Sequence, residues 1–253
     1  MLATDTFAAR KSQFLFADHL VLDESPTRDF YKELLRGLAH KNNNVLAVVQ
    51  GFSSLILMNE DLDSGTQESV QQMRDSATHS STLSERILTA GGCARISSQS
   101  LNLNEFLPLM DGNLRGLCDA KGTGFTINIS PGAQPIIADT SRLKEVLVEL
   151  VKNAAEASGE DPAGHVQLDV MGPGEWTPRD ESRVDMVLRN NGPSIAEEKL
   201  PEVYKPFYTS KGSEHFGIGL TTAGVLAGQM KMRLGIASED NLTTVWLSAP
   251  VSR

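Results

Sequence analysis

Apolar residues recur at helical spacing over a long stretch of this chain, from about Asp29 to Met58. The stripe consists of Leu34, Leu35, Leu38, Val45, Val49, Phe52, Leu55 and Ile56. This spacing predicts one amphipathic helix. Residues 59–66 lack periodicity and are expected to form a loop, after which a second helical pattern runs to about Leu88. Its inward residues should be Val70, Met73, Ala77, Leu83, Ile87 and Leu88.

Two long helices joined by a short loop predict a helical hairpin. A lone hairpin buries too little of its apolar stripe. We therefore expect two copies to associate as a homodimer through a four-helix bundle.

The pattern changes from about Leu101 onward. Helices are predicted at 104–120, 141–157 and 220–230, and short strands at 125–129, 135–139, 166–170, 184–188, 233–237 and 243–247. Helices grouped with a mixed or antiparallel sheet form an α/β sandwich, so the fold class is α+β. We expect an N-terminal segment (1–27), the hairpin (28–92), a Ser-rich linker (93–100) and the sandwich domain (101–253). The N-terminal segment has little periodicity apart from the apolar patch at 14–17.

The composition argues against several classes of protein. The formal net charge is −9 at pH 7, and no Lys/Arg cluster offers a surface for a phosphate backbone, so no nucleic-acid partner is expected. Cys93 and Cys118 cannot make a disulfide framework, which is typical of a reducing compartment. No apolar run approaches the roughly 20 residues that span a bilayer. Residues 1–10 lack the apolar stretch of a signal peptide. We therefore expect a cytoplasmic protein with no membrane association.

Four short motifs in the last part of the chain indicate nucleotide binding. They are ELVKNAA (149–155), NNGPSI (190–195), KPFYTSK (205–211) and GIGLTTA (217–223). Mg²⁺ prefers oxygen ligands, and Asn153 in mid-helix can supply one. Gly192 permits a tight turn after a strand. A Gly-x-Gly sequence that enters a helix binds anions through backbone N–H groups. The polar residues before it suggest a lid over the nucleotide, with Phe207 as its hinge anchor.

In this order and at this spacing, the motifs resemble the ATP-binding (Bergerat-type) domain of histidine kinases and of the wider gyrase, Hsp90 and MutL superfamily. The resemblance implies ATP and Mg²⁺ as cofactors. It implies Asn153 of the N box as the Mg²⁺ ligand, Asn190 and Gly192 of the G1 box near adenine, and Lys211 of the lid near the phosphates. The remaining residues expected to bind nucleotide are Phe207 of the F box and Gly217, Gly219 and Leu220 of the G2 box.

The sequence HKNNN (40–44) resembles the H box of the same family. His40 lies outside the inward stripe and should be exposed, and an unprotonated imidazole nitrogen is a competent nucleophile toward a phosphoryl group. Asn44 occupies the position that orients water in related bundles. His40 and Asn44 are therefore the candidate catalytic residues, and the other four histidines have no such context.

Three positions depart from the family. Lys41 replaces an acid that is thought to orient the histidine. Asn190 replaces the Asp that receives the adenine amino group, and Ser194 replaces a glycine. Glu149 stands where other branches of the superfamily carry a water-activating base.

The leading interpretation is a histidine kinase-like enzyme that transfers phosphoryl from ATP to His40 and then to an Asp of a response regulator receiver domain. Two alternatives stay open. One is a histidine phosphotransfer protein with a degenerate ATP site, and the other is a response-regulator phosphatase.

Overall fold

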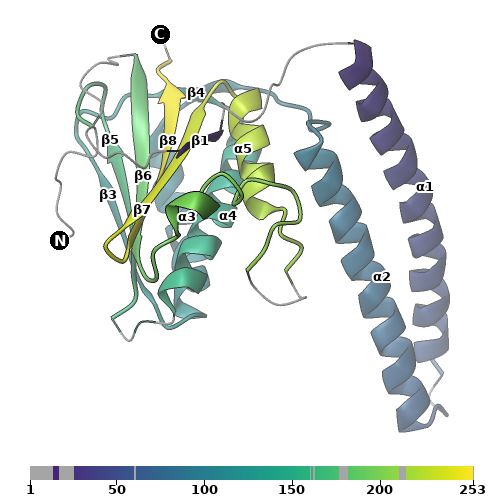
Figure 1. Cartoon of the computed structure of the whole chain (residues 1–253). Coiled ribbons are helices and arrows are strands. Elements are labelled where there is room, and N and C mark those ends of the chain that lie inside the picture. Colours follow the sequence, from purple (N-terminus) through teal and green to yellow (C-terminus); the bar gives the residue numbers. More distant parts are fainter. Residues whose placement is uncertain are drawn as a thin grey trace. The chain divides into compact units, whose positions relative to one another are not determined.

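The computed structural model describes residues 14–16, 26–59, 61–159, 161, 163–176, 182–210 and 215–252 (Figure 1). These residues belong to two compact units. One unit contains the described residues from 26 to 94, and the other contains residues 14–16 together with those from 95 onward. The second unit is therefore discontinuous in sequence, because the first is inserted between its two parts. None of the described helices combines the length and the apolar character that crossing a membrane requires.

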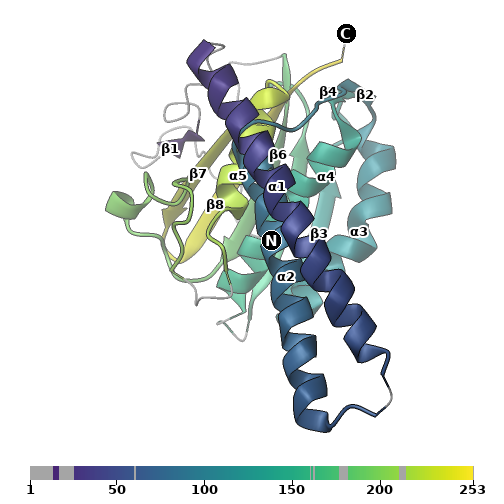
Figure 2. The same cartoon turned by 90° about the vertical axis from the view of Figure 1, so that its right-hand side faces the viewer.

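The first unit is the predicted helical hairpin, which is confirmed. Helix α1 spans Pro26–Leu57 and helix α2 spans Ser64–Ala90. Figure 2 shows the two helices side by side and joined by a short loop. Asp63 caps α2, since its carboxylate accepts a hydrogen bond from the Thr66 backbone N–H at 2.9 Å.

Only a narrow seam of the hairpin is buried. Its buried side chains are Ala39 and Ser53 on α1 and Val70, Ala77 and Ser84 on α2. Hydrogen bonds cross the seam from Asn42 Nδ2 to Ser84 Oγ at 2.8 Å and from Gln50 Nε2 to Thr78 Oγ1 at 3.1 Å.

Much of the predicted inward stripe is exposed in the single hairpin. The exposed apolar residues include Leu34, Leu38, Val45, Val48, Phe52, Leu55, Ile56 and Met73. The inward position predicted for Met73 is therefore wrong for one copy of the chain. The physical reason is that each helix of a two-helix hairpin is covered by its partner on one side only, so apolar side chains directed elsewhere stay exposed.

The second unit is a mixed sheet with helices on one face (Figure 1). The six-stranded sheet has the order β1-β7-β8-β6-β5-β3, and β2 and β4 pair separately. Among the described strands, the β3–β5 pair alone is parallel. The bounds are β1 Phe14–Leu15, β2 Gln99–Leu101, β3 Gly124–Ile129, β4 Ile136–Ala138, β5 His165–Met171, β6 Arg183–Asn191, β7 Arg233–Glu239 and β8 Leu242–Pro250. The helices are α3 Leu103–Asp119, α4 Thr140–Ser158 and α5 Gly219–Gln229, with a short 3₁₀ turn at Glu197–Lys199. The predicted α/β sandwich is confirmed.

The main core lies between the helices and one face of the sheet. Buried side chains alternate along the strands, among them Val166, Leu168 and Val170 on β5 and Val184, Met186 and Leu188 on β6. Helix α4 meets this face with Leu143, Val146, Leu147, Leu150, Val151 and Ala154, all buried. The long buried face fixes α4 on the sheet, while Glu149, Asn153 and Glu156 are only partly buried.

The other face of the sheet is polar in part. Arg189 on β6 forms a buried ion pair with Asp169 on β5, and Asn128 Nδ2 donates to the same carboxylate at 2.8 Å. Paired and hydrogen-bonded in this way, a buried charge is tolerated. An apolar cluster of Val187, Ala237 and Trp246 lies on the same face, with Trp176 packed 5.6 Å from Trp246 between ring centroids.

Candidate nucleotide site and phosphoacceptor

Helix α4 carries three oxygen-bearing side chains on its partly exposed face. Glu149, Asn153 and Glu156 lie four and three residues apart, so they share one side of the helix. The helix begins at Asp139, which caps it by accepting hydrogen bonds from the N–H groups of Ser141 and Arg142 at 3.0 and 3.1 Å. Partial burial opposes ionisation of Asp139. Backbone donors, including Ser97 at 2.7 Å, outweigh it and hold the pKa of this carboxyl below its usual value.

The start of α5 lies directly against α4. A Cβ atom placed on Gly219 would be 2.4 Å from Glu149 Oε2, so the Glu149 carboxylate lies close against the backbone of Gly219. Ile218 precedes the helix and makes no side-chain cap, which leaves the first N–H groups of α5 without a side-chain partner. Such a helix start favours an anion. Leu220 follows and is half-buried.

The F and G2 motifs meet in space. Gly217 has φ of +63°, and a Cβ there would lie 2.6 Å from the carbonyl oxygen of Tyr208 and 2.7 Å from the carbonyl carbon of Phe207. The two ends of the intervening segment are therefore in contact. Lys211 was predicted to lie near the phosphates, but it falls outside the described residues.

Phe207 adopts an uncommon backbone conformation. Its φ is +66°, in the left-handed region that a bulky residue rarely occupies, and its side chain is 58 % exposed. Backbone strain of this kind costs about 1–3 kcal/mol and tends to occur where a segment must change conformation. The predicted hinge position thus coincides with a strained residue.

The adenine end of the expected site lies where β6 ends. Asn190 is only 3 % exposed and pairs in register with Val166 and Thr243 on the helix-facing side of the sheet. Gly192 follows with φ of +149°, and a Cβ there would be 2.6 Å from the carbonyl oxygen of Ala157 in α4. Helix α4 therefore contacts the G1 turn near its C-terminus and the G2 turn at Glu149.

Ser194 has a structural role that glycine could not perform. Its Oγ accepts a hydrogen bond from the Asn241 N–H at 2.9 Å, which ties the G1 turn to the turn between β7 and β8. The departure from glycine at this position therefore adds a contact to the turn.

One contact in the site was not predicted. His215 Nε2 lies 3.2 Å from Glu156 Oε1, which joins the residues just before the G2 motif to α4. Sequence analysis assigned no role to His215. The only signal was the position of Glu156, three residues after Asn153 on the same helix face.

The residues present are compatible with a Mg²⁺ ion held together with nucleotide. Among the described residues, no group of three or more His, Cys, Asp or Glu side chains could hold a metal. A Mg²⁺ ion beside the Asn153 amide oxygen would need its other ligands from phosphate oxygens and water, which is the way Mg²⁺ is usually bound with nucleotides.

The candidate phosphoacceptor lies on the exposed side of α1. His40 is exposed, and Asn44 Nδ2 is 3.5 Å from its Nε2. An amide N–H facing Nε2 favours the tautomer whose lone pair is on that nitrogen. Lys41 is also exposed and supplies no carboxylate next to His40.

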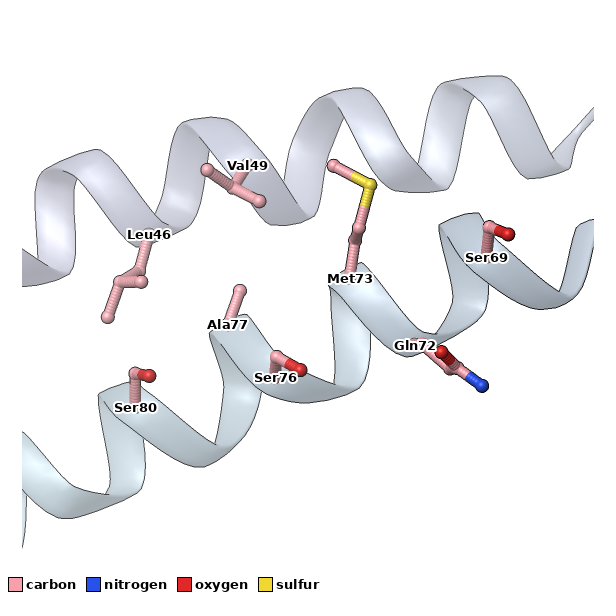
Figure 3. Close-up of a pocket in the computed structure, with 8 residues that line it drawn as sticks. All are labelled: Leu46, Val49, Ser69, Gln72, Met73, Ser76, Ala77 and Ser80. Atoms are coloured by element: carbon pink, nitrogen blue, oxygen red, sulfur yellow. The ribbon is translucent and has the colours of Figure 1, made fainter. Parts of the chain in front are cut away.

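An open groove runs between the hairpin helices farther along α1 (Figure 3). It is lined by Leu46 and Val49 of α1 and by Ser69, Gln72, Met73, Ser76, Ala77 and Ser80 of α2. Most of the α2 side chains here are small, so the groove can receive larger side chains from another helix.

Comparison with known proteins agrees with this geometry. Residues 138–253 match the family described as histidine kinase-, DNA gyrase B-, and HSP90-like ATPase. The sensory histidine kinase/phosphatase NtrB of Rhizobium leguminosarum bv. phaseoli is 27 % identical over 144 residues, which is 53 % of this chain and 37 % of NtrB. The sensor histidine kinase ZraS of Escherichia coli strain K12 is 24 % identical over 229 residues, 87 % of this chain and 46 % of ZraS. The chain thus spans less than half the length of these relatives.

Solved structures share the fold. Full-length ShkA in complex with AMPPNP superimposes with a TM-score of 0.73 at 24 % identity, covering 87 % of this chain and 46 % of ShkA. The catalytic domain of the histidine kinase ThkA gives a TM-score of 0.52 at 23 % identity, covering 61 % of this chain and 96 % of that domain.

Proposed function

We propose that this chain, which is homologous to sensor histidine kinases and whose residues 138–253 form a histidine kinase-, DNA gyrase B- and HSP90-like ATPase domain, binds ATP with Mg²⁺ and phosphorylates its own His40. The phosphoryl group then passes to an Asp of a response regulator receiver domain. The observation that carries the proposal is the contact of α4 with both glycine turns, at Gly192 and Gly219.

Each turn has a separate task in nucleotide binding. The start of α5 offers backbone N–H groups to the phosphates, with Leu220 beside them and Lys211 supplied by the lid. Asn153 offers an oxygen to Mg²⁺, which neutralises charge on the phosphates when bound. Asn190 accepts or donates a hydrogen bond at the adenine edge, without the charge assistance of an aspartate.

His40 is the nucleophile in the proposed reaction. Its Nε2 lone pair forms the new N–P bond while the bond between the γ-phosphorus and the bridging oxygen breaks, and ADP leaves with that oxygen. In this reaction the Asn44 amide, whose Nδ2 is 3.5 Å from Nε2, would donate toward Nε2 and so favour the tautomer with the lone pair on the reacting nitrogen. Catalysis of this kind depends mostly on positioning and electrostatics.

The alternative is a histidine phosphotransfer protein in which His40 receives phosphoryl from a receiver domain. Exposed Lys41 favours it, since no carboxylate is available there to accept the His40 proton. A response-regulator phosphatase is favoured by Asn44, whose amide beside His40 could orient an attacking water.

Incubation with ATP labelled at the γ-phosphate distinguishes these functions. We expect label on the chain in the presence of Mg²⁺ and its subsequent transfer to a receiver domain. Calorimetry that detects no ATP or ADP binding at millimolar nucleotide would contradict the kinase and leave the relay as the better description.

We further propose that the hairpin forms a homodimer. The exposed stripe of α1 (Leu34, Leu38, Val45, Val48, Phe52 and Leu55) repeats at intervals of three, four or seven residues, as in the interface of a helical bundle. A second copy of the hairpin is the occupant that supplies both a matching stripe and large side chains for the groove in Figure 3.

Replacing Phe52 by Asp should therefore convert the dimer into a monomer, because each copy would bury a carboxylate in the interface between the two copies. Light scattering at micromolar concentration measures the mass. Ser54→Asp is the matched control, since Ser54 is exposed two residues away on another side of α1. A wild-type chain that is already monomeric, or a dimeric Phe52→Asp chain, would refute this interface.

A further inference from the structure

Three residues from the N-terminal segment complete the ATPase unit. Strand β1 pairs antiparallel with β7, with Phe14 opposite Ile236 and Leu15 opposite Gly235. Figure 2 shows β1 at the edge of the sheet beside β7. Phe16 follows and is 3 % exposed.

The Phe16 ring occupies a pocket that is shaped for it. Its ring packs edge-on against Tyr204, with 4.8 Å between ring centroids. The ring also lies against Gly224 of α5, where a Cβ would come within 2.3–2.5 Å of three Phe16 ring carbons. Glycine within a helix is about 1 kcal/mol less favourable than alanine. Here it lets an aromatic ring lie directly against the helix backbone.

Phe16 contacts two segments that meet each other, residues 204–208 and residues 217–224. We call these segments the two arms of the lid base. Tyr204 lies three residues before the strained Phe207, and Gly224 lies five residues after Gly219 at the start of α5. A hydrogen bond from Thr221 Oγ1 to the carbonyl oxygen of Tyr204, at 2.9 Å, joins the two arms. They meet again where Gly217 lies on the backbone of Phe207 and Tyr208.

We propose that Phe16 is a positioning residue for the nucleotide site. With β1 docked, its ring holds both arms of the lid base and so fixes the start of α5. When β1 leaves the edge of β7, the arms loosen and nucleotide affinity falls. The N-terminal segment thereby controls a site from which it is distant in sequence. This inference rests on the proposed nucleotide binding.

The test uses the full chain with the substitution Phe16→Ala. Hydrogen exchange of the nucleotide-free protein should become faster in β7 and in both arms (204–208 and 217–224), while β5 and β6 keep their protection. The dissociation constant of Mg²⁺-ADP, measured by calorimetry, should rise by about tenfold, within the range typical of coupled sites. Leu109→Ala is the control, because Leu109 lies in the same unit and is 85 % exposed.

A second variant separates this effect from a simple loss of packing. Gly224→Ala places a methyl group where the ring lies and should displace Phe16 with the same consequences. In the double variant, which combines Phe16→Ala with Gly224→Ala, the new methyl group enters the space that the Phe16 ring has left. The two effects should therefore not add.

Two results would overturn the inference. One is faster exchange in β7 with unchanged exchange in the arms. The other is an unchanged ADP dissociation constant after the arms have loosened. A wild-type chain that does not bind ADP would instead contradict the proposed function, and exchange in the arms would still decide whether Phe16 holds them.

Discussion

Replacing His40 by alanine should reduce phosphorylation of the chain to background, whether the phosphoryl group comes from ATP or from a phosphorylated receiver domain. Alanine has no atom that can form the N–P bond, so no residual reaction is expected at this position. The fold should be preserved, because His40 is exposed on α1 and lies outside the buried seam of the hairpin. The amount of acid-labile label on the chain, measured by electrophoresis, gives the result.

The two sources of label make this experiment informative about function. Label that comes from ATP in the wild type and disappears in His40→Ala supports the kinase. Label that comes only from the receiver supports the relay. His79→Ala is the matched control, since His79 is an exposed histidine on α2. Undiminished labelling of His40→Ala would show that another residue is the phosphoacceptor.

Replacing Asn153 by alanine should lower labelling from ATP by about 100-fold to 1000-fold, the scale at which removal of one electrostatic contact to a transition state is felt. The amide oxygen lost is the protein ligand proposed for Mg²⁺. The Mg²⁺ dependence of ATP affinity should be lost at the same time, which calorimetry with and without Mg²⁺ measures. Transfer from a phosphorylated receiver to His40 should be unaffected, because Asn153 and His40 lie in different units.

Two companions make the Asn153 result specific. Asn153→Asp retains an oxygen ligand and should keep much of the Mg²⁺ dependence. Lys152→Ala changes the neighbouring residue of α4 and should leave the Mg²⁺ dependence of ATP affinity unchanged. If Asn153→Ala still binds ATP in a Mg²⁺-dependent manner, the assigned ligand is wrong.

The long periodic segments were predictable from sequence. The helix expected at 29–58 is α1, Pro26–Leu57, and the helix expected at 141–157 is α4, Thr140–Ser158. In both, an apolar stripe is repeated over several turns, which is what makes a long helix recognisable. In α4 this stripe is also buried, so local pattern and tertiary packing agree there. The sandwich followed from the alternation of helical and strand patterns.

The short and non-local features were not predictable. Strand β1 has two residues and β2 has three, which is too few for an alternating pattern to appear. The contact between His215 and Glu156 joins residues that share no motif, and it forms because the fold brings α4 and the residues before the G2 motif together. Ser194 could be identified from sequence only as a departure, because its partner Asn241 lies on a distant turn.

The docking of β1 on β7 has a consequence for the order of events during synthesis. Leu15 cannot pair until its partner Gly235, 220 residues later in the chain, has been synthesised. At translation rates of about 5–20 residues per second, that delay is roughly 10–45 s. The hairpin, whose contacts are local, can form in the meantime. It is synthesised between the two parts of the second unit, before β7 is available to pair with β1. The β7 edge of the six-stranded sheet is therefore closed by β1 only after β7 has left the ribosome.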